Sequence, residues 1–400
     1  MSIDDINKIF ENAVKGSSIF KNKNVLYHDF VPENLPFREK HINRLAQVFS
    51  SLLRGEKGSN MFIYGKPGTG KTAVVKYVLS KFKNFLQEKH LEVNVSYVNC
   101  RMAGTEYRVL LAIAQDIGVS LPFTGLSVEE ALSRILLKIK SDGKPFLVIF
   151  DEIDVLVSRY GDKILYSLTR FSSDTYILPH VIIGISNDLR FKDYLDPRVL
   201  SSLSEEEIVF KPYTATELEV ILKERVDLAF KDGVVDPLAI KLSAALSASE
   251  HGDARKALDI IRVAGEIAEE RGDEKILEDH VRDAYSRIDA ERTHDVIRSL
   301  PLHSKLILIS LLNYGGNTIS TSKLYMIYKS VCGRIGEQPL SYRRFHSLIS
   351  ELSIMGIVSR RIYNYGRRGG RIASIKLASP DDEIVKILAD DPLLSDILDI

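Results

Sequence analysis

The stretch GKPGTGKTAV at positions 65–74 has residues of the types and spacing that bind phosphate groups. It fits the pattern G-x-x-x-x-G-K-[ST], in which backbone N–H groups surround phosphate oxygens and the lysine, here Lys71, reaches the terminal phosphates. The hydroxyl of Thr72 is expected to bind Mg²⁺, which prefers hard oxygen ligands. The loop therefore predicts a nucleotide bound with Mg²⁺. The residues expected to contact that nucleotide are Gly65, Pro67, Gly68, Thr69, Gly70, Lys71, Thr72 and Ala73.

Two adjacent acidic residues, Asp151 and Glu152, follow the apolar run at 146–150. We expect Asp151 to help hold the Mg²⁺ ion and Glu152 to polarise the attacking water, because hydrolysis needs a base in line with the γ-phosphate. Alone, this pair could also be the N-cap of a helix. Asn187 follows another apolar run, at 181–185, where its amide could bond the γ-phosphate or the water, or simply form a turn. Together with the phosphate loop, these residues predict nucleotide hydrolysis.

The elements that must position these side chains are predicted from the apolar pattern. Residues 60 to about 200 alternate apolar runs with helical patterns, as a parallel sheet with crossover helices does. Ligands bind at the carboxyl edge of such sheets, where the loop, the acidic pair and Asn187 would meet. Strands are expected at 60–64, 94–98, 146–150 and 181–185, and a helix at 73–82.

The remainder of the chain is predicted to form two further domains. From residue 216 to about 290 the pattern is purely helical. After Pro301, three helical stretches precede two alternating runs around the turn GRRGG, which is the layout of a winged helix. The helices are expected at about 302–313, 320–330 and 341–355, and the strands at 357–363 and 371–377.

Charge is unevenly distributed along the chain, although its formal net value is zero. Residues 301–380 hold twelve lysines and arginines against two acids, whereas residues 381–400 hold seven acids against one lysine. A charge run is often only a solvated face. A basic domain beside an acidic remainder is nevertheless typical of nucleic-acid binding.

Several other protein classes are disfavoured by composition. The two cysteines, Cys100 and Cys332, lie far apart without a paired motif, which argues against a disulfide framework or a zinc site. The first residues, MSIDDINKIF, have no basic segment leading into an apolar core, so we expect no secretion signal, and no apolar run approaches the roughly 18 residues of a membrane span. We therefore expect a cytoplasmic protein that has no membrane partner.

Five arginines of the predicted winged helix are candidates for contact with double-stranded DNA. Arg343 and Arg344 lie on its third helix, which would enter the major groove, where arginine can bind guanine O6 and N7 as a bidentate pair. Arg367, Arg368 and Arg371 lie at the hairpin tip. A tip rich in glycine and arginine can approach the minor groove or the phosphates closely. The alternative is a solvated turn.

Four motifs together resemble those of the AAA+ ATPases. GKPGTGKT, FDEID, ISN followed by Asp188-Leu189, and GDAR at 252–255 are similar to the Walker A, Walker B, sensor 1 and sensor 2 motifs. LPFREKHINRLAQVF before the loop and VSLPFTGLS at 119–127 resemble the archaeal origin-recognition and Cdc-type replication initiators. The resemblance covers residues from about 17 to 377.

This resemblance implies an α/β AAA+ ATPase core with a parallel sheet and a phosphate loop, an all-helical lid and a C-terminal winged-helix domain. ATP and ADP become the expected nucleotides. The implied divisions are 1–205 for the N-terminal segment and core, 206–295 for the lid, 300–380 for the winged helix and 381–400 for an acidic C-terminal tail.

Roles for single residues also follow from the resemblance. Asn187 would be sensor 1, and Arg255 would be sensor 2, reaching the γ-phosphate from the lid. Tyr213 and Arg225 match positions that approach the nucleotide. The segment 121–127 resembles an initiator-specific insertion that contacts DNA, unless it only caps a helix at Ser127. Its candidate DNA contacts are Thr124, Gly125 and Leu126.

One position departs from the AAA+ pattern. The run LDPRVLSSLSE places Ser202 where a trans-acting arginine finger would fall. Arg198 lies four residues earlier and is the only substitute in the run. Stimulation of hydrolysis by a neighbouring subunit is therefore in doubt.

The function implied is that of an ATP-controlled initiator that binds double-stranded origin DNA and helps to load the replicative helicase, with further initiator copies on the DNA. It would be a weak ATPase that uses hydrolysis as a switch, cytoplasmic and associated with the nucleoid. One alternative is a clamp-loader or remodelling ATPase with fast, partner-stimulated turnover. Another is a winged-helix transcription regulator whose vestigial ATPase would not need Lys71.

Overall fold

The computed structural model describes residues 19–56, 58–170, 178–203, 206–315, 318–364, 371–378, 381–391 and 393–394. The chain divides into two compact units, Met1–Ala284 and Tyr285–Ile400. Within the described ranges, no helix is both long enough and apolar enough to cross a membrane.

A five-stranded parallel sheet forms the centre of the first unit, with the strand order β2-β3-β4-β1-β5. Strands β1, β3 and β4 are buried along their whole length, which explains their continuous apolar sequences. The strands are β1 Met61–Gly65, β2 Asn94–Asn99, β3 Phe146–Asp151, β4 His180–Ser186 and β5 Glu206–Phe210. The four predicted strands are confirmed. The fifth corrects the implied start of the lid at residue 206, because residues 206–210 pair with β1.

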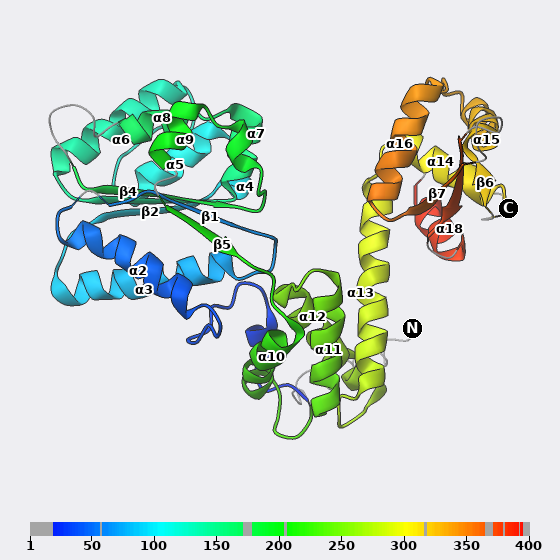
Figure 1. Cartoon of the computed structure of the whole chain (residues 1–400), viewed down its shortest axis with the longest axis horizontal. Coiled ribbons are helices and arrows are strands. Elements are labelled where there is room, and N and C mark those ends of the chain that lie inside the picture. The colour runs from blue at the N-terminus through cyan, green and yellow to red at the C-terminus, as the bar shows by residue number, and fades with distance from the viewer. Residues whose placement is uncertain are drawn as a thin grey trace, which may run out of the picture. The chain divides into compact units, whose positions relative to one another are not determined.

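Helices cover both faces of this sheet (Figure 1). Helices α2 (Glu39–Leu53) and α3 (Lys71–Lys89) pack on one face with Phe49, Val75 and Phe82. The other face carries α5 (Glu106–Asp116), α6 (Val128–Asp142), α7 (Ile153–Tyr160), α8 (Lys163–Arg170) and α9 (Pro197–Leu203). Short turns of helix lie at η1 (Lys23–Leu26), α4 (Cys100–Ala103) and η2 (Phe191–Tyr194).

A helical lid follows β5 in the same unit. Its helices are α10 (Ala215–Ala229), α11 (Pro237–Glu250), α12 (Ala254–Arg271) and the first part of α13 (Glu278–Ser299). Side-chain caps fix where the first three begin: Thr214 forms a capping box, and Asp236 and Asp253 accept N–H groups of the first turn. Residues 19–30, expected to belong with the core, are attached to the lid instead, since Phe20 packs on Phe230.

The second unit contains a three-stranded antiparallel sheet, in the order β6-β8-β7, packed against helices. Its elements are α14 (Leu302–Leu312), β6 (Ile319–Ser320), α15 (Thr321–Arg334), α16 (Tyr342–Ile354), β7 (Val358–Asn364), β8 (Arg371–Leu377) and α18 (Asp381–Ala389). The predicted winged helix is confirmed. The expected acidic tail is wrong at its start, because α18 packs Ile384, Ile387 and Leu388 into the core of this unit.

Candidate nucleotide site and nucleic-acid interface

The phosphate loop joins the end of β1 to the start of α3, and its glycines allow other segments to approach closely. A Cβ atom on Gly65 would lie 2.6 Å from the carbonyl oxygen of Phe210. One on Gly68, whose φ is +72°, would lie 1.7 Å from Oδ1 of Asp253 on the lid. Only glycine fits these two positions.

The side chain of Lys71 is buried beside the loop. Its Nζ donates to the carbonyl oxygens of Gly65 at 2.7 Å and Lys66 at 2.8 Å. Burial, with the nearby charge of Arg255, lowers the pKa of Lys71 to about 8. A bound phosphate would favour the charged ammonium, so nucleotide binding and protonation of this lysine are linked.

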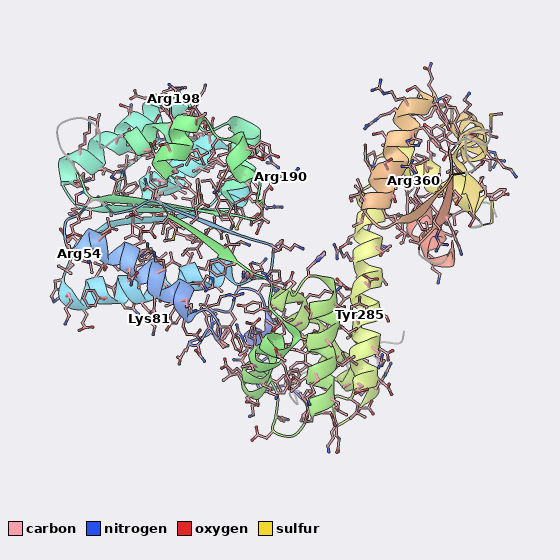
Figure 2. The ribbon with its side chains drawn as sticks, in the orientation of Figure 1. Arg54, Lys81, Arg190, Arg198, Tyr285 and Arg360 are labelled. Carbon is pink, nitrogen blue, oxygen red and sulfur yellow. The ribbon has the colours of Figure 1, made fainter. Side chains whose placement is uncertain are left out.

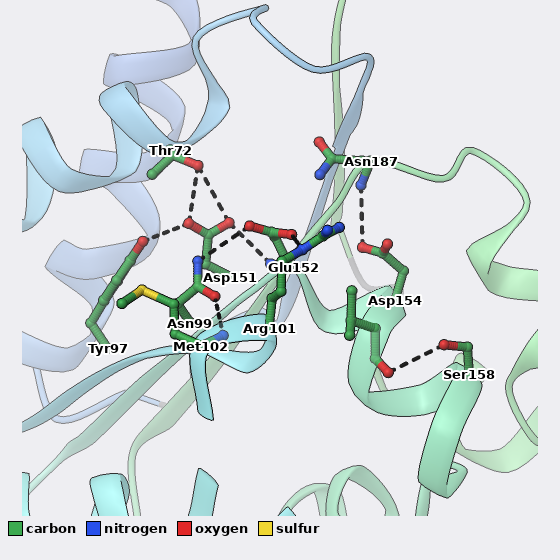
Figure 3. Close-up of polar contacts among 11 residues, drawn as sticks. Thr72, Tyr97, Asn99, Arg101, Met102, Asp151, Glu152, Asp154, Ser158 and Asn187 are labelled. Atoms are coloured by element: carbon green, nitrogen blue, oxygen red, sulfur yellow. Dashed lines mark hydrogen bonds and ion pairs between the residues drawn. The ribbon is translucent and has the colours of Figure 1, made fainter. Parts of the chain in front are cut away.

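Oxygen ligands for a metal ion meet where β2, β3 and α3 end or begin (Figure 3). The hydroxyl of Thr72 donates to Oδ2 of Asp151 at 3.0 Å, and the Tyr97 hydroxyl donates to the same oxygen at 2.6 Å. Burial and the charge of Asp151 raise the pKa of Tyr97 far above its usual value, which keeps it a donor. Among the described residues no group of three or more His, Cys, Asp or Glu side chains could hold a metal. The pair Thr72 and Asp151 fits Mg²⁺, which usually keeps several waters and takes further oxygens from phosphates.

The side chain of Glu152 is held by two residues that follow β2 or end it (Figure 3). Its carboxylate accepts hydrogen bonds from Asn99 at 3.3 Å and from Arg101. The backbone of Glu152 has a φ of 54°, in the left-handed region, at the start of α7. The sequence reasoning missed Asn99 and Arg101, although they lie after a predicted strand and hence at the same edge of the sheet.

One pocket brings together most of the predicted nucleotide contacts from core and lid. Asn187, whose N–H donates to Asp154 at 3.3 Å, lines it from the core, and Arg255 lines it from the start of α12. The predicted residues that line it are Pro67, Gly68, Gly70, Lys71, Thr72, Ala73, Asp151, Glu152, Asn187, Tyr213, Arg225 and Arg255. Gly65 and Thr69 do not line it. Thr69 is fully buried, and its hydroxyl donates to the Lys66 carbonyl at 2.8 Å.

The two residues assigned to the nucleotide from the lid side, Tyr213 and Arg225, are both buried. Arg225 donates to the carbonyl of Val25 at 3.2 Å and lies over the ring of Phe30, 4.7 Å from its centre. Burial lowers its pKa to about 10. Arg225 therefore fixes the N-terminal segment and presents part of its surface to the pocket.

That N-terminal segment forms a wall of the pocket that the sequence reasoning did not include. Residues 27–32 and 34–36 line it. His28 is attached to the lid through Nε2, 3.2 Å from Oδ2 of Asp259, and this contact raises the pKa of His28. The pocket is thus enclosed by core, lid and N-terminal segment.

Exposed basic side chains occupy the start of α16 in the second unit. Ser341 caps the helix, and Tyr342, Arg343 and Arg344 are exposed. Arg344 lies 3.3 Å from Glu351 through Nη1. Arg371 is the first residue of β8, whereas the predicted contacts Arg367 and Arg368 lie outside the described residues.

The segment 121–127 of the core is largely exposed, and Phe123 is 73% exposed. Thr124 and Gly125 are exposed, and Leu126 is half-buried. Ser127 does cap α6, accepting the N–H of Glu130 at 3.1 Å. The cap accounts for the end of the segment, and the Tyr107 hydroxyl donates to the carbonyl of Pro122 near its start.

Arg198 lies at the surface of the core on α9 (Figure 2). Its Nε and Nη2 each donate to the carboxylate of Asp196 at 3.0 Å. Its guanidinium lies 5.3 Å from the centre of the Tyr166 ring. Arg198 is therefore an exposed arginine whose guanidinium is held by Asp196, the residue that precedes its own helix.

Comparison with known proteins finds matches along nearly the whole chain. Residues 34–175 match an AAA ATPase domain, 219–286 a Cdc6 AAA+ ATPase-type lid domain, and 295–387 the C-terminal winged-helix domain of CDC6. An ORC1-type DNA replication protein of Thermococcus onnurineus is 44% identical over 402 residues, covering 99% of this chain and 97% of that protein. A second, from Archaeoglobus fulgidus, is 44% identical over 385 residues, 96% of this chain and 94% of that protein. The structure of the Aeropyrum pernix ORC1 protein in complex with DNA has a TM-score of 0.82 at 42% identity, covering 95% of this chain and 99% of that one.

Proposed function

We propose a function from the premise that this chain belongs to the family of ORC1-type DNA replication proteins: it is an ATP-controlled initiator that binds double-stranded origin DNA and helps to load the replicative helicase. The observation that carries the proposal is the pocket in which the phosphate loop, the acidic pair and Asn187 of the core meet Arg255 of the lid. In this proposal, a nucleotide bound in the pocket contacts the core and the lid together and thereby controls the position of the lid.

Each nucleotide-site residue has a defined task in this proposal. Lys71 binds the terminal phosphates, Thr72 and Asp151 hold Mg²⁺, and Glu152 orients and polarises the attacking water. When bound, Mg²⁺ neutralises charge on the phosphate oxygens. Asn187 and Arg255 contact the γ-phosphate from the core and the lid. Tyr213 and Arg225 contact the nucleotide from the connector and the first lid helix.

Slow hydrolysis, used as a switch, is favoured over fast turnover. The carboxylate that would act on water, Glu152, is bonded to Asn99 and Arg101. Arg198, the only substitute for an arginine finger within the run LDPRVLSSLSE, is bonded to Asp196. A clamp loader or remodelling motor would need both groups available, so this pattern supports the switch.

DNA contact is assigned to the winged helix and to the segment 121–127. Arg343 and Arg344 would read base edges in the major groove, and Arg367, Arg368 and Arg371 of the wing would contact the minor groove or phosphates. Thr124, Gly125 and Leu126 would add contacts from the core. That the Aeropyrum relative was solved in complex with DNA supports DNA binding by this chain. We further propose a cytoplasmic, nucleoid-associated protein that acts with further initiator copies and the helicase.

The proposal is tested by footprinting the full chain on random genomic fragments with ATP, with ADP and without nucleotide. We expect discrete protected sites whose occupancy depends on the nucleotide, and loss of that dependence in Lys71→Ala. A transcription regulator with a vestigial ATPase would bind equally well in all three conditions. A motor would protect no preferred sequence and would turn over ATP rapidly.

Mode of DNA contact is tested with two sets of variants. Arg343→Ala and Arg344→Ala should lower affinity for the preferred sequence by about 1–3 kcal/mol and relax preference at single base pairs. The triple change Arg367→Ala, Arg368→Ala and Arg371→Ala should weaken all sequences alike and reduce the salt slope by roughly two to three units if the wing lies on phosphates. A wing in a narrow minor groove would lose more affinity on A·T-rich sites.

The matched control is Lys386→Ala, which removes an exposed cation from α18 of the same unit. It should leave both the affinity for the preferred sequence and the salt slope unchanged. Indistinguishable profiles for helix and wing variants would contradict the placement of these elements on DNA.

A further inference from the structure

We propose that Arg38 is a positioning residue that couples the phosphate loop to the connector at 211–214, so that the nucleotide in the loop sets the position of the lid. This inference rests on the proposed function, because it requires a nucleotide in the pocket. Arg38 lies at the N-cap of α2, outside the pocket lining, and is 5% exposed.

The guanidinium of Arg38 joins two backbone segments that are far apart in sequence. Nε and Nη2 both donate to the carbonyl oxygen of Thr69, at 3.1 and 2.9 Å. Nη2 also donates to the carbonyl of Lys211 at 3.0 Å. One planar side chain therefore holds a carbonyl of the phosphate loop and a carbonyl at the end of β5.

The same guanidinium packs against the aromatic residue of the connector. It lies over the ring of Tyr213, 3.8 Å from the ring centre. The Tyr213 hydroxyl in turn lies 2.8 Å from where a Cβ on Gly70 would be. Arg38, Tyr213 and the loop thus form one packed layer, in which a displacement of the loop displaces its neighbours.

No carboxylate of the described residues forms an ion pair with Arg38. Its neighbour Glu39 instead accepts the N–H of Phe37 at 3.1 Å. The carbonyl of Phe37 accepts from Nη1 of Arg38, also at 3.1 Å. Phe37 has a φ of 64°, a conformation that non-glycine residues rarely adopt, and these bonds hold it there. The bond to the Phe37 carbonyl therefore fixes the orientation of the Arg38 guanidinium, while the charges of Glu217 and Glu39 act on it without forming an ion pair.

The connection continues from the connector into the lid. The N–H of Tyr213 donates to the carbonyl of Gly252 at 3.2 Å, and the N–H of Ala254 donates to the carbonyl of Gly68 at 3.1 Å. Ala254 begins α12, whose next residue is Arg255. A shift of Thr69 on phosphate entry would pass through Arg38 to Tyr213 and then to the helix that carries Arg255.

The test measures lid position and turnover in the full chain. Spin labels are attached at Glu88→Cys on α3 and Lys241→Cys on α11, both exposed positions, since Cys100 and Cys332 are buried and will not react. Pulsed electron paramagnetic resonance then gives the core–lid distance without nucleotide and with Mg·ATP.

Two variants of Arg38 are compared with a control on the same helix. Arg38→Lys keeps the charge but loses the planar fork, and Arg38→Met removes both. The control is Arg44→Met, which removes an arginine of α2 that pairs with Glu206 of β5 and has no contact with the loop.

We expect the distance to change on ATP binding in the parent and in Arg44→Met, and not in either Arg38 variant. The Arg38 variants should bind Mg·ATP within about threefold of the parent Kd, while kcat falls about tenfold with little change in KM. Arg38 variants that show the full distance change would overturn the inference and leave the proposed function intact. If Arg38 had only a structural role, its variants would show a lower unfolding temperature and a lower ATP affinity together. That outcome would also refute the inference. A parent chain that binds no ATP would overturn both.

Discussion

Removing helix α18 and the turn that follows it, up to Leu394, should abolish most of the stability of the second unit. Ile384, Ile387, Leu388 and Leu394 are each no more than 4% exposed. Fully burying one such side chain contributes about 1.5–3 kcal/mol, so the four contribute roughly 6–12 kcal/mol, an upper limit because unfolded chains already bury part of their surface. A domain of this size is stable by only about 5–15 kcal/mol. A fragment ending at the implied winged-helix boundary, residue 380, should therefore be largely unfolded.

The assay is urea unfolding of the fragments 285–394 and 285–380, followed by far-ultraviolet circular dichroism because the chain has no tryptophan. We expect a cooperative transition for the longer fragment and little or none for the shorter. Two leucines give a matched comparison inside the longer fragment. Leu388→Ala, at a buried position, should cost about 2–5 kcal/mol, whereas Leu393→Ala, 71% exposed, should change stability by less than about 0.5 kcal/mol. Equal urea midpoints for the two fragments would refute the reasoning.

Three further predictions concern the first unit. Because the pKa of Lys71 is lowered to about 8, Mg·ATP binding at pH 8.5 should take up roughly 0.7 proton, measured by calorimetry in buffers of different ionisation enthalpy; no uptake would contradict it. Arg101→Ala should release Glu152 and raise basal ATP turnover about threefold to fivefold, an effect that the added change Glu152→Gln should remove. The contact with Asp259 raises the pKa of His28, so the stability it adds is fully present below the unfolded value of 6.5 and is lost as pH rises through the folded value. The difference in unfolding temperature between the parent and His28→Gln should accordingly shrink from about pH 5.5 to pH 9, and a pH-independent difference would contradict the assignment.

The parts of the site that could be predicted from the sequence are those marked by local sequence patterns. The phosphate loop and the acids after 146–150 could be found because each lies within a few residues of a buried strand, and parallel strands bring their carboxyl ends together. The contacts of Arg38 with Thr69 and of Arg101 with Glu152 span 31 and 51 residues, and nothing in the neighbouring sequence marks them.

The missed elements had weaker or conflicting signals. Strand β5 is short, begins with two acids and alternates partly buried with exposed residues before Phe210. In α18 the spacing of Ile384, Ile387 and Leu388 is that of an amphipathic helix, but the acidic residues around them favour a solvated tail. The tip of the wing, with Arg367 and Arg368, lies outside the described residues.

The pairing of β1 also sets an order of events during synthesis of the chain. Its two neighbours, β4 and β5, comprise residues 180–186 and 206–210, so the strand that ends at the phosphate loop has no partner until most of the first unit has been made. At about 5–20 residues per second, the ribosome needs roughly 6–24 seconds to pass from residue 65 to residue 186. During that interval Phe62 and Ile63, fully buried in the finished sheet, are exposed on an unpaired strand. The nascent protein is therefore exposed to aggregation at the segment on which its nucleotide site will depend.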